Sequence, residues 1–494
     1  MSETENLALP ETDVHYKDVR MYVENTPIEG YEHASEKARE DFRDIKFGVR
    51  IHWGLYTKLQ LQQESWPFLK MSYEDRQKYQ ALYREFMPEC FSTEEWMRFF
   101  KKAGFRCFAF TSKHHDGFSL FDTKTRVKRR ANWTAPNGPQ VEECDLAYSV
   151  MDTPFKRDIV GELCEAARKY NIKIDLYFSH PDWYDADFRP YTFHPLTVPN
   201  VKDLLPQKEF DEMPSRFDTM RPVTVSALTK EERARMIARH REQLRELLTN
   251  YGKIDMLCLD MWLGKDVWPE LRETIMTLRK ICPDIMLRCR GIGNYGDYYT
   301  PEGFVPGKKE NTDMPWMVIY PLANTFSYDP DGSRYKGSEW VIRNLVDAVA
   351  KGGNFMVGIG PDENGLWHPK AIEQLEEAGK WLTVNGEAIY GTRARPDLLY
   401  REGESLYFTR SKDSKNIYAI CVGWPGASFN VKTVIPKEGT DIFLLGHEER
   451  LKWEYDDKRG LTIYLPDHLQ NEGNRPCGTA YSFRISGASP HGKD

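Results

Sequence analysis

The sequence lacks the features of several protein classes. It has no run of lysine and arginine of the kind that binds nucleic acid, and its net charge is −7. It also has no apolar stretch of the roughly 18 residues that a membrane span requires. We therefore expect neither a nucleic-acid nor a membrane partner, while a homo-oligomer stays open.

Signals for export, metal binding and redox chemistry are missing as well. The first residues, MSETENLALPETDV, are acidic and contain no basic and apolar leader. We expect the chain as given to be cytoplasmic, or periplasmic or secreted if a leader has been removed. The nine cysteines form no CxxC pair, and no HxH or HExxH motif occurs. The sequence therefore predicts buried free thiols, no metal site and no cofactor.

Apolar runs alternate with amphipathic helical patterns over most of the chain. The predicted helices span residues 92–104, 156–171, 268–281 and 338–353. The predicted strands span residues 47–53, 105–111, 172–178, 254–260, 285–289, 316–322 and 354–360. Several strands are apolar at nearly every position, as expected for a parallel sheet that is covered on both faces. Seven or eight strand–helix units favour an α/β fold closed into a (β/α)8-like TIM-type barrel.

The pattern changes near residue 392, where helical periodicity ends. Short alternating strands separated by turn residues then predict a C-terminal β-sandwich. The predicted domains are an N-terminal extension (1–45), a catalytic barrel (46–392) and a C-terminal β-sandwich (393–494). Two irregular stretches, 185–229 and 291–315, follow strand ends, on the face where barrel enzymes carry their chemistry.

Polar residues stand at the ends of five predicted strands. They are His52, His114, His115, Tyr177, His180, Asp260 and Arg290. Because the carboxyl ends of barrel strands converge on one mouth, these side chains are expected to gather there. Asp260 ends an apolar strand in MLCLDMW, where an ionised carboxylate needs a partner. It is either a helix-capping residue or a nucleophile or base held at the mouth of a pocket.

The residues at this mouth belong to segments that resemble a known family. KFGVRIHWGLY, AGFRCFAFTSKHHDGF, KRDIVGELCEAARKYNI, IDMLCLDMW, GGNFMVGIGPDENG and WLTVNGEAIYGT occur in this order. They are similar to the signature segments of the family 29 glycoside hydrolases, the α-L-fucosidases, over about residues 46–393. The resemblance implies a retaining exo-α-L-fucosidase that hydrolyses terminal α-L-fucose through a covalent glycosyl-enzyme, with a fucosylated glycan as partner.

The resemblance also implies roles for individual residues. Asp260 matches the nucleophile of the family. Glu64 and Trp66 match a Glu–Trp pair that faces the sugar, although Ser65 separates them here. The tryptophans would pack the apolar face and the methyl group of fucose, or else belong to the core at the barrel ends. The substrate-binding residues implied or proposed in this way are His52, Glu64, Trp66, His114, His115, Tyr177, Trp262, Arg290 and Trp316.

The acid/base residue is where this chain departs from the family. Many relatives place a glutamate directly after the tryptophan that opens the sixth strand, but here Met317 occupies that place. Other members take the acid from the preceding loop, near a segment similar to GDYYTPE, which points to Glu302. Glu310, which follows Lys308 and Lys309, is the runner-up. Either glutamate is alternatively an ordinary solvated loop residue.

Three other interpretations stay open at this point. His52, His114, His115 and Asp260 could be metal ligands of a barrel hydrolase. The loss of the glutamate at position 317 could leave a catalytically weak or silent fucose-binding protein. The substrate could also be a related sugar such as α-L-galactose.

Overall fold

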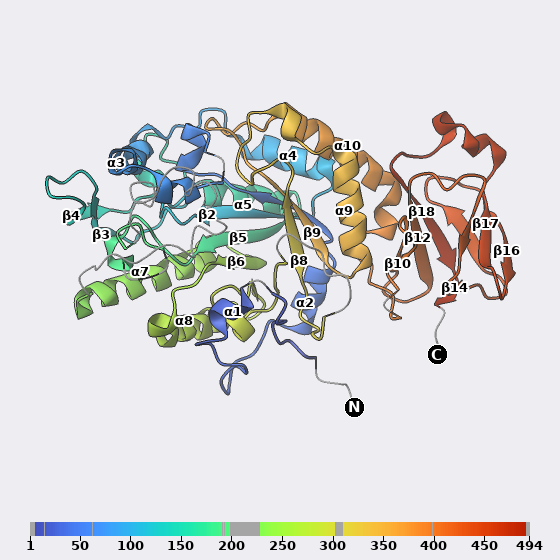
Figure 1. The fold of residues 1–494 in the computed structure, drawn as a ribbon, viewed down its shortest axis with the longest axis horizontal. Coiled ribbons are helices and arrows are strands. Elements are labelled where there is room, and N and C mark those ends of the chain that lie inside the picture. The colour runs from blue at the N-terminus through green and yellow to red at the C-terminus, as the bar shows by residue number, and fades with distance from the viewer. Residues whose placement is uncertain are drawn as a thin grey trace, which may run out of the picture.

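The fold was analysed in a computed structural model. It describes residues 5–13, 15–61, 63–189, 191, 193–197, 228–301, 310–397 and 399–490. Within these residues the chain forms a barrel, coloured blue to orange in Figure 1, and a smaller β domain, coloured orange to red, at one side of it.

The barrel is built on a seven-stranded parallel sheet in the order β7-β6-β5-β2-β1-β9-β8. Almost every side chain of these strands is buried, because helices cover the outside and side chains fill the inside. The strands are β1 (Phe47–Ile51), β2 (Cys107–Lys113), β5 (Lys173–Ser179), β6 (Met256–Asp260), β7 (Met286–Leu287), β8 (Met317–Pro321) and β9 (Asn354–Ile359).

A short segment fills the gap between β7 and β8. Tyr298 forms a parallel bridge with Arg288, and Tyr299 forms a parallel bridge with Trp316. The amide of Cys289 donates to the carbonyl of Tyr298 over 3.0 Å, and the amide of Met317 donates to that of Tyr299 over 3.1 Å. Residues 297–300 therefore take the place of an eighth strand and close the barrel.

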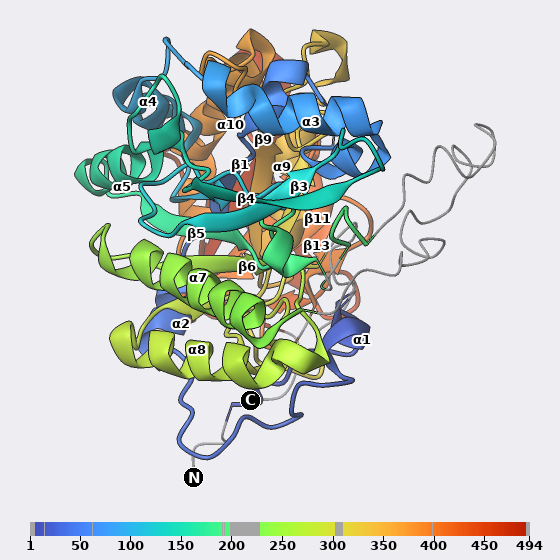
Figure 2. The ribbon, with the colours of Figure 1, turned by 90° about the vertical axis from the view of Figure 1, so that its left-hand side faces the viewer.

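Helices surround the sheet as the sequence pattern predicts. In α4, the side chain of Ser92 caps the first turn and Gly104, at φ +83°, ends the last. Helices α9, α10, α4 and α5 pack side by side in that order, and α7 packs against α8 (Figure 2). The helices are α1 (Tyr16–Val19), α2 (Glu36–Arg43), α3 (Tyr73–Ala81), α4 (Thr93–Ala103), α5 (Ile159–Lys169), α7 (Lys230–Thr249), α8 (Trp268–Ile281), α9 (Ser338–Ala350) and α10 (Pro369–Asn385).

The hairpin of β3 (Val127–Asn132) and β4 (Gln140–Leu146) lies on the side of the barrel opposite to the C-terminal domain (Figure 1).

The C-terminal domain consists of antiparallel sheets. A five-stranded and a three-stranded sheet enclose a shared apolar core that includes Phe408, Val431 and Ile463. The first sheet contains β10 (Arg401–Glu402), β11 (Leu406–Arg410), β12 (Asn416–Val422), β18 (Ala480–Ser486) and β15 (Asp441–Leu444). The second contains β13 (Ser428–Val431), β17 (Gly460–Tyr464) and β16 (Lys452–Asp456), and β14 (Val434–Ile435) pairs with β19 (Ser489–Pro490).

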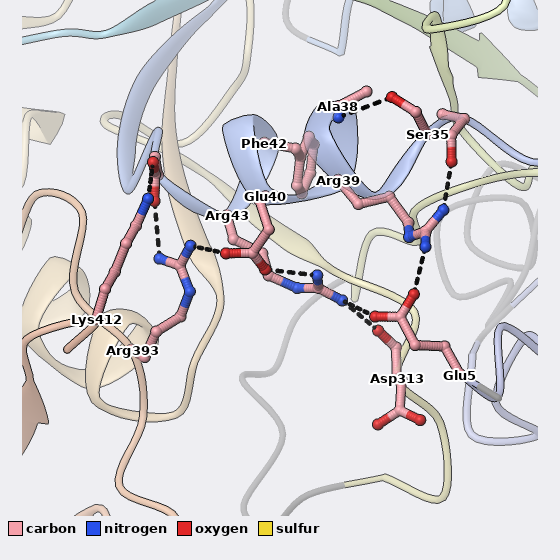
Figure 3. A network of polar contacts seen from close by, with 12 residues as sticks. Glu5, Ser35, Ala38, Arg39, Glu40, Phe42, Arg43, Asp313, Arg393 and Lys412 are labelled. Atoms are coloured by element: carbon pink, nitrogen blue, oxygen red, sulfur yellow. Dashed lines mark hydrogen bonds and ion pairs between the residues drawn. The ribbon is translucent and has the colours of Figure 1, made fainter. Parts of the chain in front are cut away.

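Hydrogen bonds and ion pairs join the two domains. The indole of Trp381 in α10 donates to the carbonyl of Ala480 over 2.8 Å. Arg393 contacts Glu40 of α2, as Figure 3 shows. Its Nη1 also lies 2.8 Å from Asp44 Oδ1. The predicted TIM-type barrel with a C-terminal β domain is confirmed, and the predicted boundaries at residues 46 and 393 lie between regular elements.

Candidate active site

The carboxylate of Asp260 lies at the carboxyl end of β6, where the barrel opens. The hydroxyl of Tyr177 donates to Asp260 Oδ2 over 2.6 Å, and Arg290 Nη1 donates to Oδ1 over 2.6 Å. Arg288 Nη1 lies 3.5 Å from the same Oδ1. Asp260 is 7% exposed, so it is a buried carboxylate with a hydrogen bond on each oxygen.

The charges around Asp260 keep it ionised. Burial alone would raise the pKa of its carboxyl group, but Arg290 and then Arg288 hold that pKa well below its usual range. Arg50 adds to this effect from β1, where its guanidinium lies 4.7 Å from the centre of the Tyr177 ring. An ionised carboxylate that faces a barrel mouth is suited to act as a nucleophile. A helix-capping role is not what the contacts show, because both oxygens bind other side chains.

Three histidines form a cluster beside Asp260. The ring of His114 stacks on that of Tyr177, with 5.6 Å between the centroids. The centroids of the His114 and His115 rings are 4.1 Å apart. The ring centroid of His52, the residue after β1, lies 5.8 Å from that of His114 and 5.9 Å from that of Tyr177. The structure thus brings together six of the residues that the sequence placed at strand ends: His52, His114, His115, Tyr177, Asp260 and Arg290.

Burial keeps two histidines of the cluster, His52 and His114, neutral. It lowers the pKa of His52 well below the usual range, and Arg50 lowers it further. Burial lowers the pKa of His114 in the same way, with His115 as the next cause. A neutral imidazole carries one donor and one acceptor nitrogen, and Ser65 and Ser179 contact Nδ1 of His114 and His115 respectively. The ring nitrogens of His52 and the second nitrogen of His114 are suited to bind hydroxyl groups.

Trp66 and Trp262 lie at the same end of the barrel. The Trp66 ring meets that of His115 edge-on at 4.5 Å and that of Trp183 at 5.4 Å. Trp262 follows Asp260 by two residues and packs edge-on against Phe193 at 5.7 Å. Both side chains are half-buried, so part of each ring surface is open to a ligand.

Glu64 is buried and supports a neighbouring loop. Its Oε1 accepts hydrogen bonds from the Thr325 hydroxyl (3.1 Å) and from the amides of Phe326 (3.2 Å) and Ser327 (3.1 Å). This loop places the Phe326 ring 5.2 Å from the ring of His52. At least one oxygen of Glu64 therefore shapes the pocket wall, which differs from the direct sugar contact that the sequence suggested.

Removal of this carboxylate should destabilise the protein. Glu64→Ala leaves two amides and one hydroxyl without their buried acceptor, which we expect to lower the free energy of unfolding by about 1–3 kcal/mol. Denaturant titration measures the change, with Glu74→Ala on the exposed face of α3 as the control. Equal unfolding free energies for the two variants would show that the loop does not depend on Glu64.

Three residues at this site were not predicted from the sequence. Arg50 and Arg288 interrupt the apolar strand patterns FGVRIHW and IMLRC, and a charged residue inside a buried strand was the signal that could have found them. Phe326 carried no such signal, since an aromatic residue in a loop is unremarkable. Only the contact between its loop and Glu64 brings it to His52.

Three predictions about the site need correction. Trp316 precedes β8 and lies against Gly353, which precedes β9, so it belongs to the amino-terminal end of the barrel rather than the mouth. Glu310 lines a cavity of about 320 Å³ together with Trp316, which separates it from the mouth and argues against it as the acid. His180 is buried, with Nδ1 3.0 Å from His240 Nε2 and Nε2 3.3 Å from the Arg290 carbonyl oxygen. Both ring nitrogens therefore have partners within the protein, and His180 does not belong to the histidine cluster.

Glu302, the first candidate for the acid, lies outside the described residues. Within the part of the chain that is described, no cluster of three or more His, Cys, Asp or Glu side chains is arranged to hold a metal ion. None of the described helices has the length and apolar character needed to cross a bilayer. All nine cysteines are free thiols, and five of them are buried.

The mouth of the barrel combines neutral imidazoles, half-buried aromatic rings and an ionised carboxylate. Groups of these kinds suit the hydroxyl groups, the apolar face and the developing positive charge of a sugar under cleavage. The chain is a glycoside hydrolase built on a TIM-type barrel.

Comparison with known proteins identifies the family. The family Alpha-L-fucosidase matches residues 24–387, and the family Alpha-L-fucosidase C-terminal domain matches residues 402–486. The chain belongs to the α-L-fucosidase family, glycoside hydrolase family 29, and the resemblance of its sequence segments is confirmed. It is 30% identical to human tissue α-L-fucosidase over 474 residues, which cover 90% of this chain and 88% of the relative.

Solved structures share the fold. An α-L-fucosidase isoenzyme 1 from Paenibacillus thiaminolyticus matches 91% of this chain and 99% of its own, with a TM-score of 0.70 and 24% identity. A family 29 α-L-fucosidase from Bacteroides thetaiotaomicron, trapped as a covalent intermediate with 2-fluoro-fucosyl fluoride, matches 94% of this chain and 98% of its own. Its TM-score is also 0.70, at 22% identity.

Proposed function

We propose that this protein is a retaining exo-α-L-fucosidase that hydrolyses terminal α-L-fucose from a fucosylated glycan. The observation that carries the proposal is the Asp260 carboxylate, held ionised by Arg290 and Arg288 beside the neutral imidazoles of His52 and His114. A covalent intermediate trapped in a relative of the same fold agrees with a retaining mechanism.

Two carboxyl groups share the reaction. Asp260 attacks the anomeric carbon while the acid protonates the leaving oxygen, and the fucosyl group becomes bonded to Asp260. The acid, now a carboxylate, then removes a proton from water, which attacks the same carbon and releases Asp260. Retaining enzymes hold the two groups roughly 5–5.5 Å apart, so that no water separates them.

Glu302 is the residue we propose as this acid. Pro301, the residue before it, is buried at the end of the segment that takes the place of the eighth strand. That segment pairs with Arg288, whose Nη1 lies 3.5 Å from Asp260. Position 302 thus directly follows a strand position that is two places from β6, whereas Glu310 lines a cavity with Trp316 at the other end of the barrel.

The remaining predicted residues fit recognition of fucose. The histidines bind its hydroxyl groups, which would align the anomeric carbon with Asp260. Trp66 and Trp262 offer ring surface for the apolar face and the methyl group. Tyr177 and Arg290 orient the nucleophile through one oxygen each.

The charge on Arg290 makes the proposal testable through pH dependence. Arg290 lowers the pKa of Asp260, so Arg290→Met should raise it, and Asp260 would then lose its charge at a higher pH. We expect the acidic limb of the kcat/KM profile to move up by about 1–3 pH units. Arg245→Met, at an exposed i,i+3 ion pair in α7, is the control. An unchanged acidic limb would mean that Arg290 does not set the ionisation of Asp260.

The direct test is hydrolysis of a fucosylated oligosaccharide followed by NMR. The proposal predicts that α-L-fucose is released first and then equilibrates with the β anomer. Release of the β anomer would overturn the retaining mechanism. Binding of fucose without turnover would instead indicate a silent fucose-binding protein.

Two further measurements separate the other interpretations. Turnover of an α-L-galactoside at the same kcat/KM as the fucoside would indicate that the pocket accepts a hydroxyl where fucose has a methyl group. Loss of activity in EDTA, restored by a divalent ion, would favour the metal-dependent hydrolase. Our proposal predicts a preference for the fucoside and full activity in EDTA.

A further inference from the structure

His180 joins the main chains that carry the nucleophile and its arginine. It directly follows β5, and its amide donates to the carbonyl of Asp260 over 3.0 Å. Nε2 of its ring lies 3.3 Å from the carbonyl oxygen of Arg290. The side chains of these two residues meet at 2.6 Å, between Arg290 Nη1 and Asp260 Oδ1. His180 therefore contacts both partners of the ion pair through their main chains.

Two turns pack against the ring of His180. Met261, which follows Asp260, has φ +63°, and Gly291, which follows Arg290, has φ +76°. A Cβ atom added to Gly291 would lie 2.7 Å from the carbonyl oxygen of Met261 and 2.9 Å from His180 Nε2. Only glycine fits at this position, so the turn after Arg290 lies directly on the His180 ring and on the turn after Asp260.

The partners of His180 determine which of its ring nitrogens carries the proton. The carbonyl oxygen of Arg290 can only accept, so Nε2 of His180 is the donor. In a neutral ring Nδ1 must then accept, and it lies 3.0 Å from Nε2 of His240. His240 Nε2 is therefore a donor as well. The hydrogen bonds run in one direction, from α7 through His180 to Arg290.

The placement of His240 supports this direction. The centroids of the two imidazoles are 5.2 Å apart and their planes differ by 22°. That separation is nearly the longest that a contact of 3.0 Å between ring nitrogens allows, so the rings meet edge to edge, as an N–H···N hydrogen bond requires. His240 also packs edge-on against Phe178 of β5 at 5.5 Å, and α7 lies beside β5 in Figure 2. A regular helix and a regular strand thus fix the ring of His180.

Burial keeps both rings neutral. It lowers the pKa of His180 to about 4 and that of His240 well below its usual range. A second proton on His180 would turn two N–H groups toward each other, so the order of donors holds only while the pair is neutral. The charged groups that act on the two rings are Lys113 on β2, Asp260 on β6, and Arg239 and Arg241 on α7.

We propose that His180 is a positioning residue, which holds the main chain of Arg290 so that the guanidinium faces the nucleophile Asp260. His240 contributes by fixing the tautomer that this contact needs. The inference rests on the proposed function, because the charge that His180 would help to maintain is that of the nucleophile.

The test uses two substitutions that keep different nitrogens of the ring. The amide of His180→Asn lies near the place of Nδ1 and does not reach the Arg290 carbonyl, whereas His180→Gln can place an N–H near Nε2. For His180→Asn we expect kcat to fall about three- to tenfold with little change in KM, as for the loss of one hydrogen bond. The acidic limb of kcat/KM should move up by about 0.5–1 pH unit, because Arg290 then holds Asp260 ionised less firmly. His180→Gln should stay closer to the wild type.

A double variant separates positioning from general destabilisation. If His180 acts through Arg290, then His180→Asn in the Arg290→Met background should move the acidic limb no further than Arg290→Met does alone. His194→Asn is the matched control. His194 is a buried histidine in the same loop, and its Nδ1 accepts from the amide of Leu196 over 3.2 Å. Its loss should lower Tm and leave the acidic limb in place.

The inference fails if the acidic limb of His180→Asn stays where the wild type has it, or if the same shift is added on top of that of Arg290→Met. If His180→Asn does not fold, His240→Phe takes its place, because it removes the donor to Nδ1 and should move the limb in the same direction. An unmoved limb there would count equally against the inference. A wild-type protein that releases fucose from no fucoside would overturn the proposed function, and the inference with it.

Discussion

Asp260→Gly should abolish hydrolysis of natural fucosides and leave the protein folded. Without the nucleophile no glycosyl-enzyme forms, and we expect kcat to fall on the order of 10⁴-fold, which corresponds to about 5 kcal/mol of barrier. Release of fucose from a fucosylated oligosaccharide, followed over time, measures the loss. Asp266→Ala, an exposed aspartate six residues further along the chain, is the control and should retain full activity.

Azide makes this prediction specific to the chemistry. In Asp260→Gly a small anion fits the space of the missing carboxylate and attacks from the same face as the nucleophile. We therefore expect azide to restore turnover of nitrophenyl fucoside and to yield β-fucosyl azide. Formation of the α-azide would assign the acid/base role to Asp260 instead.

Glu302→Ala should produce a large loss that depends on the leaving group. A natural leaving sugar needs protonation, so kcat on an oligosaccharide should fall about 10²–10⁴-fold, the usual contribution of general acid catalysis. Nitrophenolate scarcely needs a proton, so formation of the glycosyl-enzyme from nitrophenyl fucoside should be nearly unaffected. Pre-steady-state measurement of nitrophenol release separates this step from the slower hydrolysis of the intermediate.

Glu310→Ala is the control for the assignment of the acid. Because Glu310 lines the cavity that contains Trp316, its removal should leave kcat on both substrates unchanged. In Glu302→Ala, azide attacks the glycosyl-enzyme after one inversion, so the product should be α-fucosyl azide. Loss of oligosaccharide hydrolysis in Glu310→Ala, with Glu302→Ala active, would reverse the two roles.

The sequence predicts the barrel well because each of its strands can be recognised from its own continuous run of apolar residues. The predicted strands at 47–53, 254–260 and 354–360 correspond to β1 (Phe47–Ile51), β6 (Met256–Asp260) and β9 (Asn354–Ile359). Continuous apolar runs are required wherever helices and core cover both faces of a parallel strand. The bridge at Tyr298 and Tyr299 was not foreseen, since two paired residues in a Gly-rich and Tyr-rich stretch leave no periodicity.

The sequence predicted those site residues that lie at the carboxyl ends of strands. Asp260, His52 and His114 end strands, so topology alone brings them together. Trp316 was misplaced because it opens a strand, and the start of a parallel strand lies at the opposite end of the barrel. Phe326 could not be predicted from the pattern, because its position depends on the tertiary contact of its loop with Glu64.

Covalent labelling of the nucleophile tests the central claim most directly. The protein is incubated with 2-fluoro-fucosyl fluoride, digested with protease, and the labelled peptide is sequenced by mass spectrometry. We predict a single fluorofucosyl group on Asp260, together with loss of activity that recovers as the adduct hydrolyses. A label on another carboxylate, or continued turnover of the reagent with Asp260 unmodified throughout, would contradict the account.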